Sequence, residues 1–123
     1  MHYLIGIAAV PGGGKSLLAQ TLATKLFDTS IIDYDSYQTI TQQPLEEIIQ
    51  LMKKGANYNQ LIIPQLGEDL AKLKSGKSVT EPLKKIEISP AKYLLFETPF
   101  GREHFDSGQH IDMLFWMYRS MWL

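Results

Sequence analysis

The sequence predicts an α/β fold, in which helices cover both faces of a parallel sheet of about four strands. Three observations lead to this prediction. Short apolar runs alternate along the chain with stretches of helical periodicity. The apolar runs contain few polar residues, which is typical of strands that are buried on both faces. A glycine-rich segment joins the first apolar run to the first helical stretch, as in the strand, loop and helix units of such a sheet.

The first half of the chain contains two expected strands and two expected helices. Tyr3 to Ala8 is apolar throughout and predicts the first strand, and Leu17 to Leu26 predicts a helix because its leucines recur at helical spacing. Ser30 to Tyr34 predicts a short second strand. A second helix is expected from Pro44 to Lys54 with Thr41 as its cap, because proline suits a first helical turn and a glycine follows the last residue.

The second half adds one expected helix and two expected strands. The helix is expected from about Asn59 to Lys74, restarted at Pro64 and ended by Gly76. Ala91 to Glu97 and Ile111 to Met117 predict the third and fourth strands. Because crossover connections between parallel strands are right-handed, this order of elements leaves few possible topologies.

The composition fits one globular domain that spans residues 1–123. The chain is 45% hydrophobic and 20% charged, with a net charge of -1 and a pI near 6.3. A dense basic face, which nucleic acids and anionic membranes would favour, is therefore not expected. The sequence has no cysteine, no basic leader before the first strand and no apolar run near the ~20 residues of a membrane span. We expect a cytoplasmic protein without disulfides or thiolate metal sites.

The segment from Ala9 to Ser16 predicts a phosphate-binding loop. Its successive glycines allow the backbone N–H groups to turn toward phosphate oxygens, and the following helix adds the positive end of its dipole. Lys15 can reach the β and γ phosphates of a nucleoside triphosphate, and the Ser16 hydroxyl can ligate Mg²⁺. We therefore expect ATP and Mg²⁺ as cofactors, on a P-loop NTPase-type three-layer sandwich. The expected nucleotide-binding residues are Pro11, Gly12, Gly13, Gly14, Lys15, Ser16 and Leu17.

One position departs from the usual phosphate-loop pattern G-x-x-x-x-G-K-[ST]. Ala9 stands where the first glycine is expected, a difference of one methyl group. A plain glycine turn between a strand and a helix is the alternative interpretation. It accounts for the glycines, but it does not account for Lys15 and Ser16 directly after them.

Acidic residues end two of the predicted strands. Asp33 and Asp35 come at the end of the second strand, and Glu97 ends the third. In a parallel sheet, the chemistry collects beyond the carboxyl ends of the strands. Glu97 is expected to hold Mg²⁺ there, directly or through water, opposite Ser16. The alternative is that Glu97 caps a turn and that the two aspartates are ordinary turn residues.

Four segments of the chain, taken together, are similar to one group of phosphotransferases. The segments are Ile5 to Ala8 with the glycine loop, Ile31 to Tyr37, Asp69 to Val79, and Tyr93 to Glu97. They resemble the uridine kinase and phosphoribulokinase group of P-loop kinases. The resemblance implies a small-molecule kinase that transfers a phosphoryl group from ATP to a hydroxyl of a nucleoside or another small metabolite. It implies that Asp35 accepts the proton of the attacking hydroxyl and that Glu97 lies near Mg²⁺, so Asp35 and Lys15 are the expected catalytic residues.

Two departures from this family pattern leave other functions open. The segment from Thr80 to Ile86 is shorter than the one that helps uridine kinases to hold the nucleoside, and it lacks that segment's His and Arg. The family also continues after its fourth strand into a helix, an arginine-bearing lid and a fifth strand, whereas this sequence stops at Leu123. We therefore expect a fold that is incomplete at the C-terminus. The alternatives to an active kinase are a nucleotide-binding remnant without turnover and a P-loop hydrolase that positions water.

The segment from Ile111 to Leu123 is dense in large apolar side chains. A segment of this kind either packs back on its own core or is buried by a second chain, because exposed apolar edges associate. We expect a homo-oligomer that forms through this segment.

Three further residues are candidates for contacts with the small-molecule substrate. Arg102 follows the third strand, and it either contacts phosphate or substrate or pairs with Glu103 in solvent. Tyr37 either lines the acceptor pocket or packs against the second helix. Asp33 is the third candidate. The histidines show no ligand spacing and predict no metal site.

Overall fold

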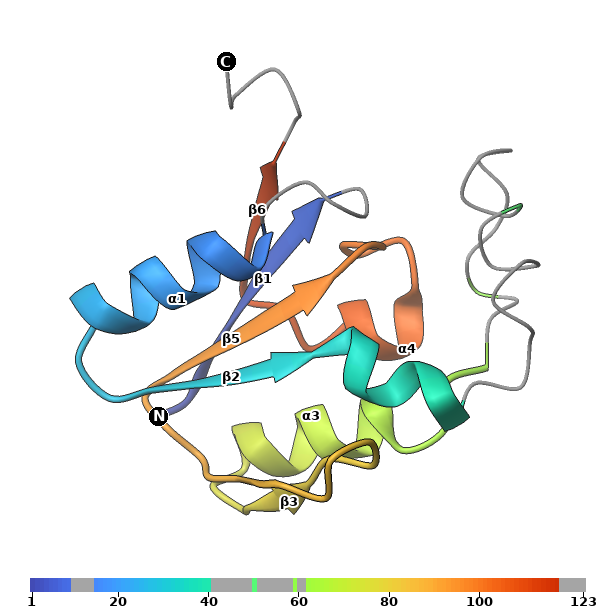
Figure 1. Cartoon of the computed structure of the whole chain (residues 1–123), viewed down its shortest axis with the longest axis horizontal. Helices are drawn as coiled ribbons and strands as arrows, with labels where there is room; N and C mark the ends of the chain where they lie inside the picture. Colours follow the sequence, from blue (N-terminus) through green and yellow to red (C-terminus); the bar gives the residue numbers. More distant parts are fainter. Residues whose placement is uncertain (10–14, 41–49, 51–58, 60–61, 118–123) are drawn as a thin grey trace.

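The computed structural model describes residues 1–9, 15–40, 50, 59 and 62–117, and it contains the parallel sheet that the sequence predicts. Four strands pair in the order β2-β5-β1-β6, and each of these pairings is parallel. Figure 1 shows the strands running side by side in one direction. Their bounds are Tyr3–Ala9 for β1, Thr29–Asp33 for β2, Tyr93–Thr98 for β5 and Met113–Met117 for β6.

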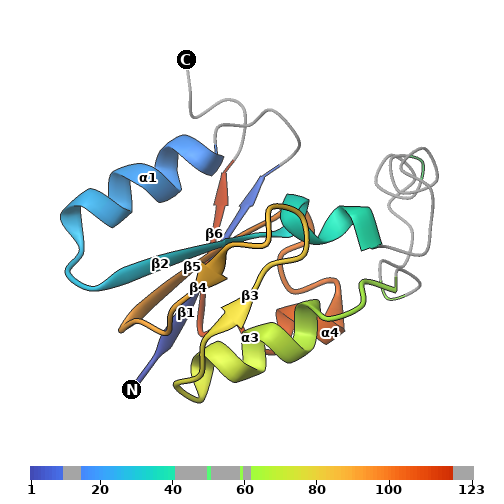
Figure 2. The same cartoon turned by 60° about the horizontal axis from the view of Figure 1, so that its bottom comes forward.

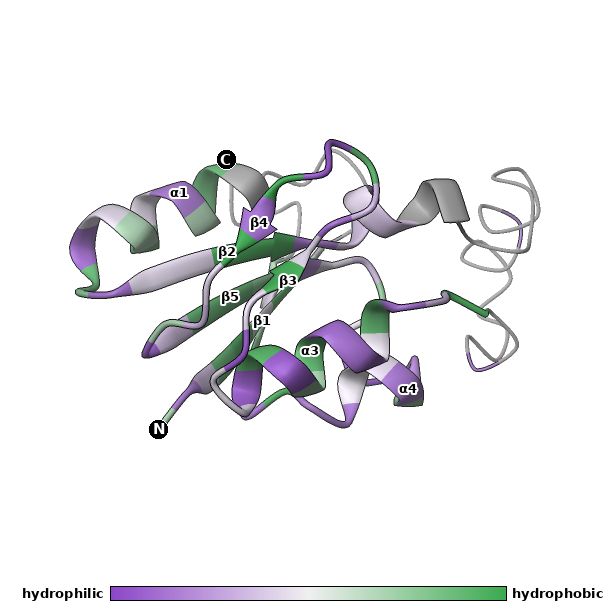
Figure 3. Cartoon of the chain, turned by 90° about the horizontal axis from the view of Figure 1, so that it is seen from below, coloured by the Kyte–Doolittle hydropathy of each residue, from purple (hydrophilic) through white to green (hydrophobic). Residues whose placement is uncertain are grey.

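Helices cover both faces of this sheet, so the described part of the chain forms three layers (Figure 3). α1 (Lys15–Lys25) lies on one face. α3 (Leu66–Lys74) and the short α4 (Phe105–Gly108) lie on the other. The α/β prediction is confirmed. None of the helices in the described residues combines the length and the apolar character needed to cross a membrane.

Two smaller elements complete the fold on the side of β2. The 3-10 helix η1 (Tyr34–Ile40) follows β2 directly. β3 (Val79–Thr80) and β4 (Glu87–Ile88) form an antiparallel hairpin that lies between α3 and β5 in the chain. Figure 2 shows the hairpin beside α3, and a 2.7 Å hydrogen bond from the Ser30 hydroxyl to the carbonyl of Ser89 ties its end to β2.

The side chains of each strand alternate between the two faces of the sheet, and this alternation produces two apolar clusters. On the α1 face, Ile7 and Leu95 belong to one cluster with Ala19 of the helix. On the opposite face, Leu4 belongs to a larger cluster with Leu70 of α3. The strands are mostly apolar (Figure 3) because both of their faces are covered.

The predicted strands and the first predicted helix are confirmed, with small shifts at their ends. α3 begins just after Pro64, where the sequence predicts a restart. Gly76 follows its end with a φ of 88°, a left-handed conformation that glycine adopts without strain. The helix expected from Pro44 to Lys54 lies outside the described residues, apart from Gln50, which is helical.

η1, the β3–β4 hairpin and α4 were not predicted. β3 and β4 have 2 residues each and α4 has 4, which is too few for a hydrophobic period to show. η1 has 7 residues, and its apolar residues recur at every third position, which is the repeat of a 3-10 helix rather than that of an α-helix. The hairpin turn contains Lys84 and Lys85, which are exposed as the sequence suggests.

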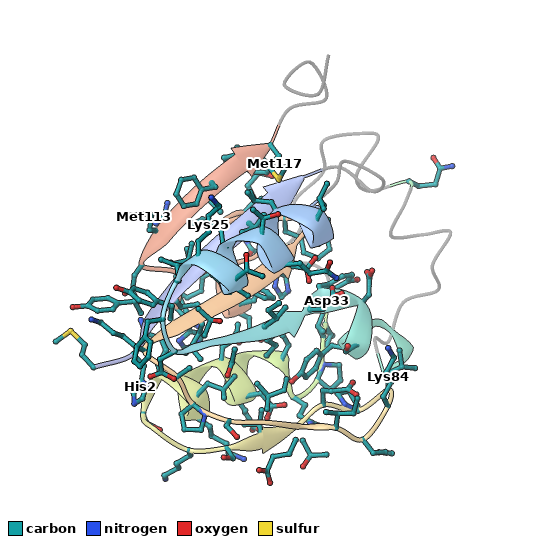
Figure 4. The ribbon with its side chains drawn as sticks, turned by 60° about the vertical axis from the view of Figure 1, so that its left-hand side comes forward. His2, Lys25, Asp33, Lys84, Met113 and Met117 are labelled. Carbon is teal, nitrogen blue, oxygen red and sulfur yellow. The ribbon has the colours of Figure 1, made fainter. Side chains whose placement is uncertain are left out.

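β6 forms one edge of the described sheet, where β1 is its neighbour. Met113, Phe115 and Trp116 are 55%, 44% and 39% exposed, so β6 is less covered than a central strand would be. Figure 4 shows Met113 and Met117 toward the two ends of this strand. A Cβ on Gly101, whose φ is 58°, would come within 2.7 Å of the Trp116 ring. Glycine therefore lets the loop after β5 approach β6. The predicted oligomer stays a prediction.

Candidate functional site

The carboxyl ends of the parallel strands meet at one edge of the sheet, and the chain leaves β1 at this edge before the glycine-rich segment. β1 ends at Ala9 and α1 begins at Lys15, so residues 10–14 connect the strand to the helix. The amino end of α1, a helix of 11 residues, follows this connection directly. This is the strand, loop and helix order that the phosphate-binding pattern requires, and it brings the positive end of a helix dipole to the carboxyl edge.

Most of the predicted nucleotide contacts cannot be placed further, because they lie outside the described part of the chain. Residues 10–14 and the side chains of Lys15 and Ser16 are not described. Leu17, in the first turn of α1, is exposed. The predicted contacts that stay predictions are Pro11, Gly12, Gly13, Gly14, Lys15, Ser16 and Leu17.

Two carboxylates are neighbours at the carboxyl edge and lie on the same face as α1. Asp33 of β2 is the register partner of Glu97 of β5, and Glu97 is the partner of Ile7 of β1. Paired residues of adjacent parallel strands point to the same face of the sheet, and Ile7 belongs to the cluster that packs on α1. Glu97 is only 4% exposed, whereas Asp33 is half-buried. Both acids therefore face the layer in which α1 begins.

Asp33 also shapes the turn into η1. Its Oδ1 accepts a 3.0 Å hydrogen bond from the backbone N–H of Asp35, the local contact by which aspartate favours turns. Asp35 is the second residue of η1, and its side chain is exposed. The Asp35 carboxylate is thus accessible to a small molecule at the carboxyl edge, which is a geometric requirement for a general base.

Tyr37, a candidate for substrate contact, is fully buried in the cluster between the sheet and α3. Its hydroxyl donates a 2.6 Å hydrogen bond to Oδ2 of Asp69. Burial, together with the neighbouring carboxylates of Asp69 and Glu81, raises the pKa of Tyr37 well above its usual value. The hydroxyl therefore remains a proton donor at neutral pH. The structure places this ring in the core, packed against α3.

Arg102 lies in the loop after β5, and its side chain is exposed. One of its guanidinium nitrogens is 3.5 Å from the carbonyl oxygen of Asp112. Asp112 directly precedes β6, at the amino edge of the sheet, so the side chain of Arg102 extends away from the carboxyl edge. No ion pair joins Arg102 to Glu103 among the described side chains.

The acids of the carboxyl edge are suited to a magnesium ion that is also bound by phosphate oxygens and water. No three His, Asp or Glu side chains of the described residues gather closely enough to hold a metal ion alone. Mg²⁺ does not need such a cluster, because it keeps several waters and binds through one or two carboxylates together with phosphate oxygens. Asp33 and Glu97 supply hard oxygen donors on the face of the sheet that α1 covers. The donor chemistry therefore fits Mg²⁺ held with a nucleotide.

Two buried acids next to η1 were not predicted as candidate functional residues. Asp69 is 3% exposed and Glu81 is 5% exposed. Asp69 had a signal in the sequence, because it lies three residues after Leu66 and one before Leu70, on the buried stripe of α3. A charged residue on such a stripe requires a partner, and here the partner is Tyr37. Glu81 had no periodic signal of this kind.

The comparisons with known proteins identify a fold. No protein-family model matches the chain, and no curated protein is similar to it in sequence. Among solved structures, one that matches is described as a possible uridine kinase from Bacillus stearothermophilus. It is 17% identical to this chain, and the match covers 94% of this chain and 70% of that chain with a TM-score of 0.61. The protein therefore has a three-layer α/β fold like that of this solved structure.

Proposed function

We propose that this protein binds ATP with Mg²⁺ at the carboxyl edge of its sheet and transfers the γ-phosphoryl group to a hydroxyl of a small metabolite. One observation carries the proposal. The edge at which β1 leads into the glycine-rich segment and α1 is also the edge that carries Asp33, Asp35 and Glu97. A phosphate cradle beside acids for a metal and for a proton is the arrangement that phosphoryl transfer needs.

The phosphates are proposed to lie between the glycine-rich segment and the amino end of α1. The backbone N–H groups of residues 11–17, the Lys15 ammonium and the helix dipole would all attract their negative charge. Ser16 and Glu97 would hold Mg²⁺, either directly or through water. Bound there, Mg²⁺ would supply positive charge that neutralises the charge developing on the phosphates.

Asp35 is proposed to be the general base. The oxygen of the acceptor hydroxyl forms a bond to the γ phosphorus, the bond from that phosphorus to the β–γ bridging oxygen breaks, and ADP leaves. Asp35 takes the proton of the acceptor hydroxyl in the same step. Its exposed carboxylate and its backbone contact with Asp33 support this role, because the group is both accessible and held at the edge.

The acceptor is proposed to be an alcohol group of a small metabolite, and a nucleoside is one member of that class. The solved structure described as a possible uridine kinase supports including nucleosides. The turn between β3 and β4 is short, so it supplies few side chains for a nucleoside base. Pantothenate and sugar phosphates are therefore tested beside uridine.

The test combines calorimetric titration of ATP and Mg²⁺ with a transfer assay on the same sample, using γ-labelled ATP and the three acceptor types. Binding followed by label on an acceptor supports the kinase. Release of phosphate without label on any acceptor indicates a P-loop hydrolase instead. Binding without either reaction indicates a remnant that has lost turnover, and no binding at all refutes the nucleotide site.

A further inference from the structure

Two residues of η1 are each held by an acid of another element. The backbone N–H of Asp35 donates to Asp33 of β2 at 3.0 Å, and the hydroxyl of Tyr37 donates to Asp69 of α3 at 2.6 Å. Figure 4 shows Asp33 at the end of β2 and Lys84 in the hairpin turn, with η1 near both. The start of η1 is therefore fixed from two elements of the fold, β2 and α3.

Asp69 links η1 to α3 and, through a neighbour, to the hairpin. Its side chain is 3% exposed, and Oδ2 accepts a second hydrogen bond from the amide nitrogen Nε2 of Gln65 at 3.1 Å. The same nitrogen donates to the backbone carbonyl of Thr80 in β3 at 3.1 Å. Displacement of Tyr37 would therefore leave a buried carboxylate without one of its donors, which is costly.

Glu81 closes the hairpin turn. Its carboxylate accepts the backbone N–H groups of Leu83 and Lys84 at 2.9 and 2.7 Å. These contacts fix the turn that follows β3, the strand whose Thr80 carbonyl accepts from Gln65.

Apolar contacts would attach η1 to the core without the free-energy cost of removing a carboxylate from water. A buried acid costs free energy even when it is hydrogen-bonded, and apolar residues of similar size are often as stabilising. What a directional bond adds is a fixed position of its donor. Departures from plain apolar packing are expected at functional sites, and Asp35, two residues before Tyr37, is the exposed acid of the carboxyl edge.

We infer that Asp69 is a positioning residue, which holds Tyr37 so that the carboxylate of Asp35 stays aimed at the acceptor hydroxyl. This inference rests on the proposed kinase function. Asp69 does not touch the substrate in this role, because it acts through Tyr37 and η1. A displaced base costs turnover without weakening nucleotide binding, since the proposed phosphate contacts belong to the segment before α1.

The main test is Tyr37→Phe, which removes the hydroxyl and keeps the buried ring. We expect kcat to fall on the order of 10- to 100-fold, with unchanged affinity for ATP and Mg²⁺. We also expect faster amide hydrogen exchange at Asp35 and Ser36, a readout that does not require turnover. Tyr93→Phe is the matched control, because Tyr93 is a half-buried tyrosine at the start of β5, and it should change none of these quantities.

Two variants of Asp69 separate positioning from stability. Asp69→Asn keeps an oxygen acceptor for the Tyr37 hydroxyl and should retain most of the turnover. The double variant Tyr37→Phe with Asp69→Leu removes both polar partners together, which restores stability to a large extent. We expect it to melt near the wild type and still to show the low kcat and the fast exchange at Asp35.

The outcomes distinguish this inference from the proposed function. A wild type that labels none of the acceptors refutes the kinase and, with it, the role of Asp35. An active wild type beside a Tyr37→Phe variant of normal kcat and normal exchange refutes the positioning inference alone. Recovery of kcat together with the melting temperature in the double variant also refutes it, because stability would then explain the loss.

Discussion

Replacing Glu81 by alanine should lower the free energy of unfolding by about 2 kcal/mol. The carboxylate accepts short hydrogen bonds from the N–H groups of Leu83 and Lys84. A longer contact of 3.4 Å comes from Ile86. Bonds to a charged group contribute roughly 1.5–3 kcal/mol each, but these turn residues are exposed and water replaces part of the loss. Two short bonds at about 1 kcal/mol each set the magnitude, which for 123 residues lowers Tm by roughly 6–10 °C.

The assay is thermal unfolding followed by circular dichroism, and the control is Glu87→Ala. Glu87 is an exposed acid of the same hairpin, so its loss should leave Tm nearly unchanged. A Tm of Glu81→Ala equal to that of the wild type would show that the turn does not depend on the carboxylate.

The pH dependence of the stability difference between the wild type and Glu81→Ala gives a second readout. Burial alone would raise the pKa of Glu81, but the N–H groups of the turn and the Ser36 hydroxyl outweigh burial and lower the pKa below its ordinary value. A group with a lowered folded-state pKa stabilises the protein above its unfolded-state pKa, and the stabilisation is lost as the pH falls through the folded-state pKa. The gap in stability between wild type and Glu81→Ala should therefore be full near neutral pH and shrink in acid. A gap that widens on acidification would refute the reasoning.

Three further predictions concern the proposed site and the exposed strand. Lys15→Ala should abolish binding of ATP and Mg²⁺ in calorimetric titration, and an unchanged affinity would place the nucleotide elsewhere. Asp35→Asn should keep nucleotide binding and lower transfer at least ~10²-fold in the label assay, the scale of a general base; normal turnover would contradict that role. Self-association is expected to bury the exposed side of β6, so sedimentation should show an oligomer for the wild type and for the surface control Thr24→Lys, but single chains for Phe115→Lys. A monomeric wild type at micromolar concentration would count against an interface on β6.

The sheet could be predicted because its strands follow one physical rule. β1 and β5 are covered on both faces, so nearly every position is apolar and the strand is visible without knowledge of its neighbours. α1 could be predicted for a related reason, since its apolar residues repeat with the helical period on the side that packs on the sheet. The hairpin could not, because β3 and β4 have 2 residues each, which is too few for an alternating pattern to show.

Some features of the candidate site could likewise be predicted from the sequence, and others could not. The positions of Asp33, Asp35 and Glu97 at the carboxyl edge could be predicted, because the sequence shows where the strands end. The directions of the Tyr37 and Arg102 side chains could not be predicted, because they depend on which partners tertiary folding brings near. Tyr37 meets Asp69, which is 32 positions away in the sequence, and no local pattern connects the two.

The two interpretations of Asp33, as a turn residue and as an acid of the proposed site, are compatible. The turn uses Oδ1 of the carboxylate, which accepts the N–H of Asp35, while an ionised carboxylate offers about four acceptor positions on two oxygens. The same residue is the register partner of Glu97 on the face of α1. An acid that forms the turn is therefore also fixed in direction, and a fixed direction is what a group beside a metal or a base requires. At the end of a parallel strand, a structural contact of an acid is thus no argument against a functional one.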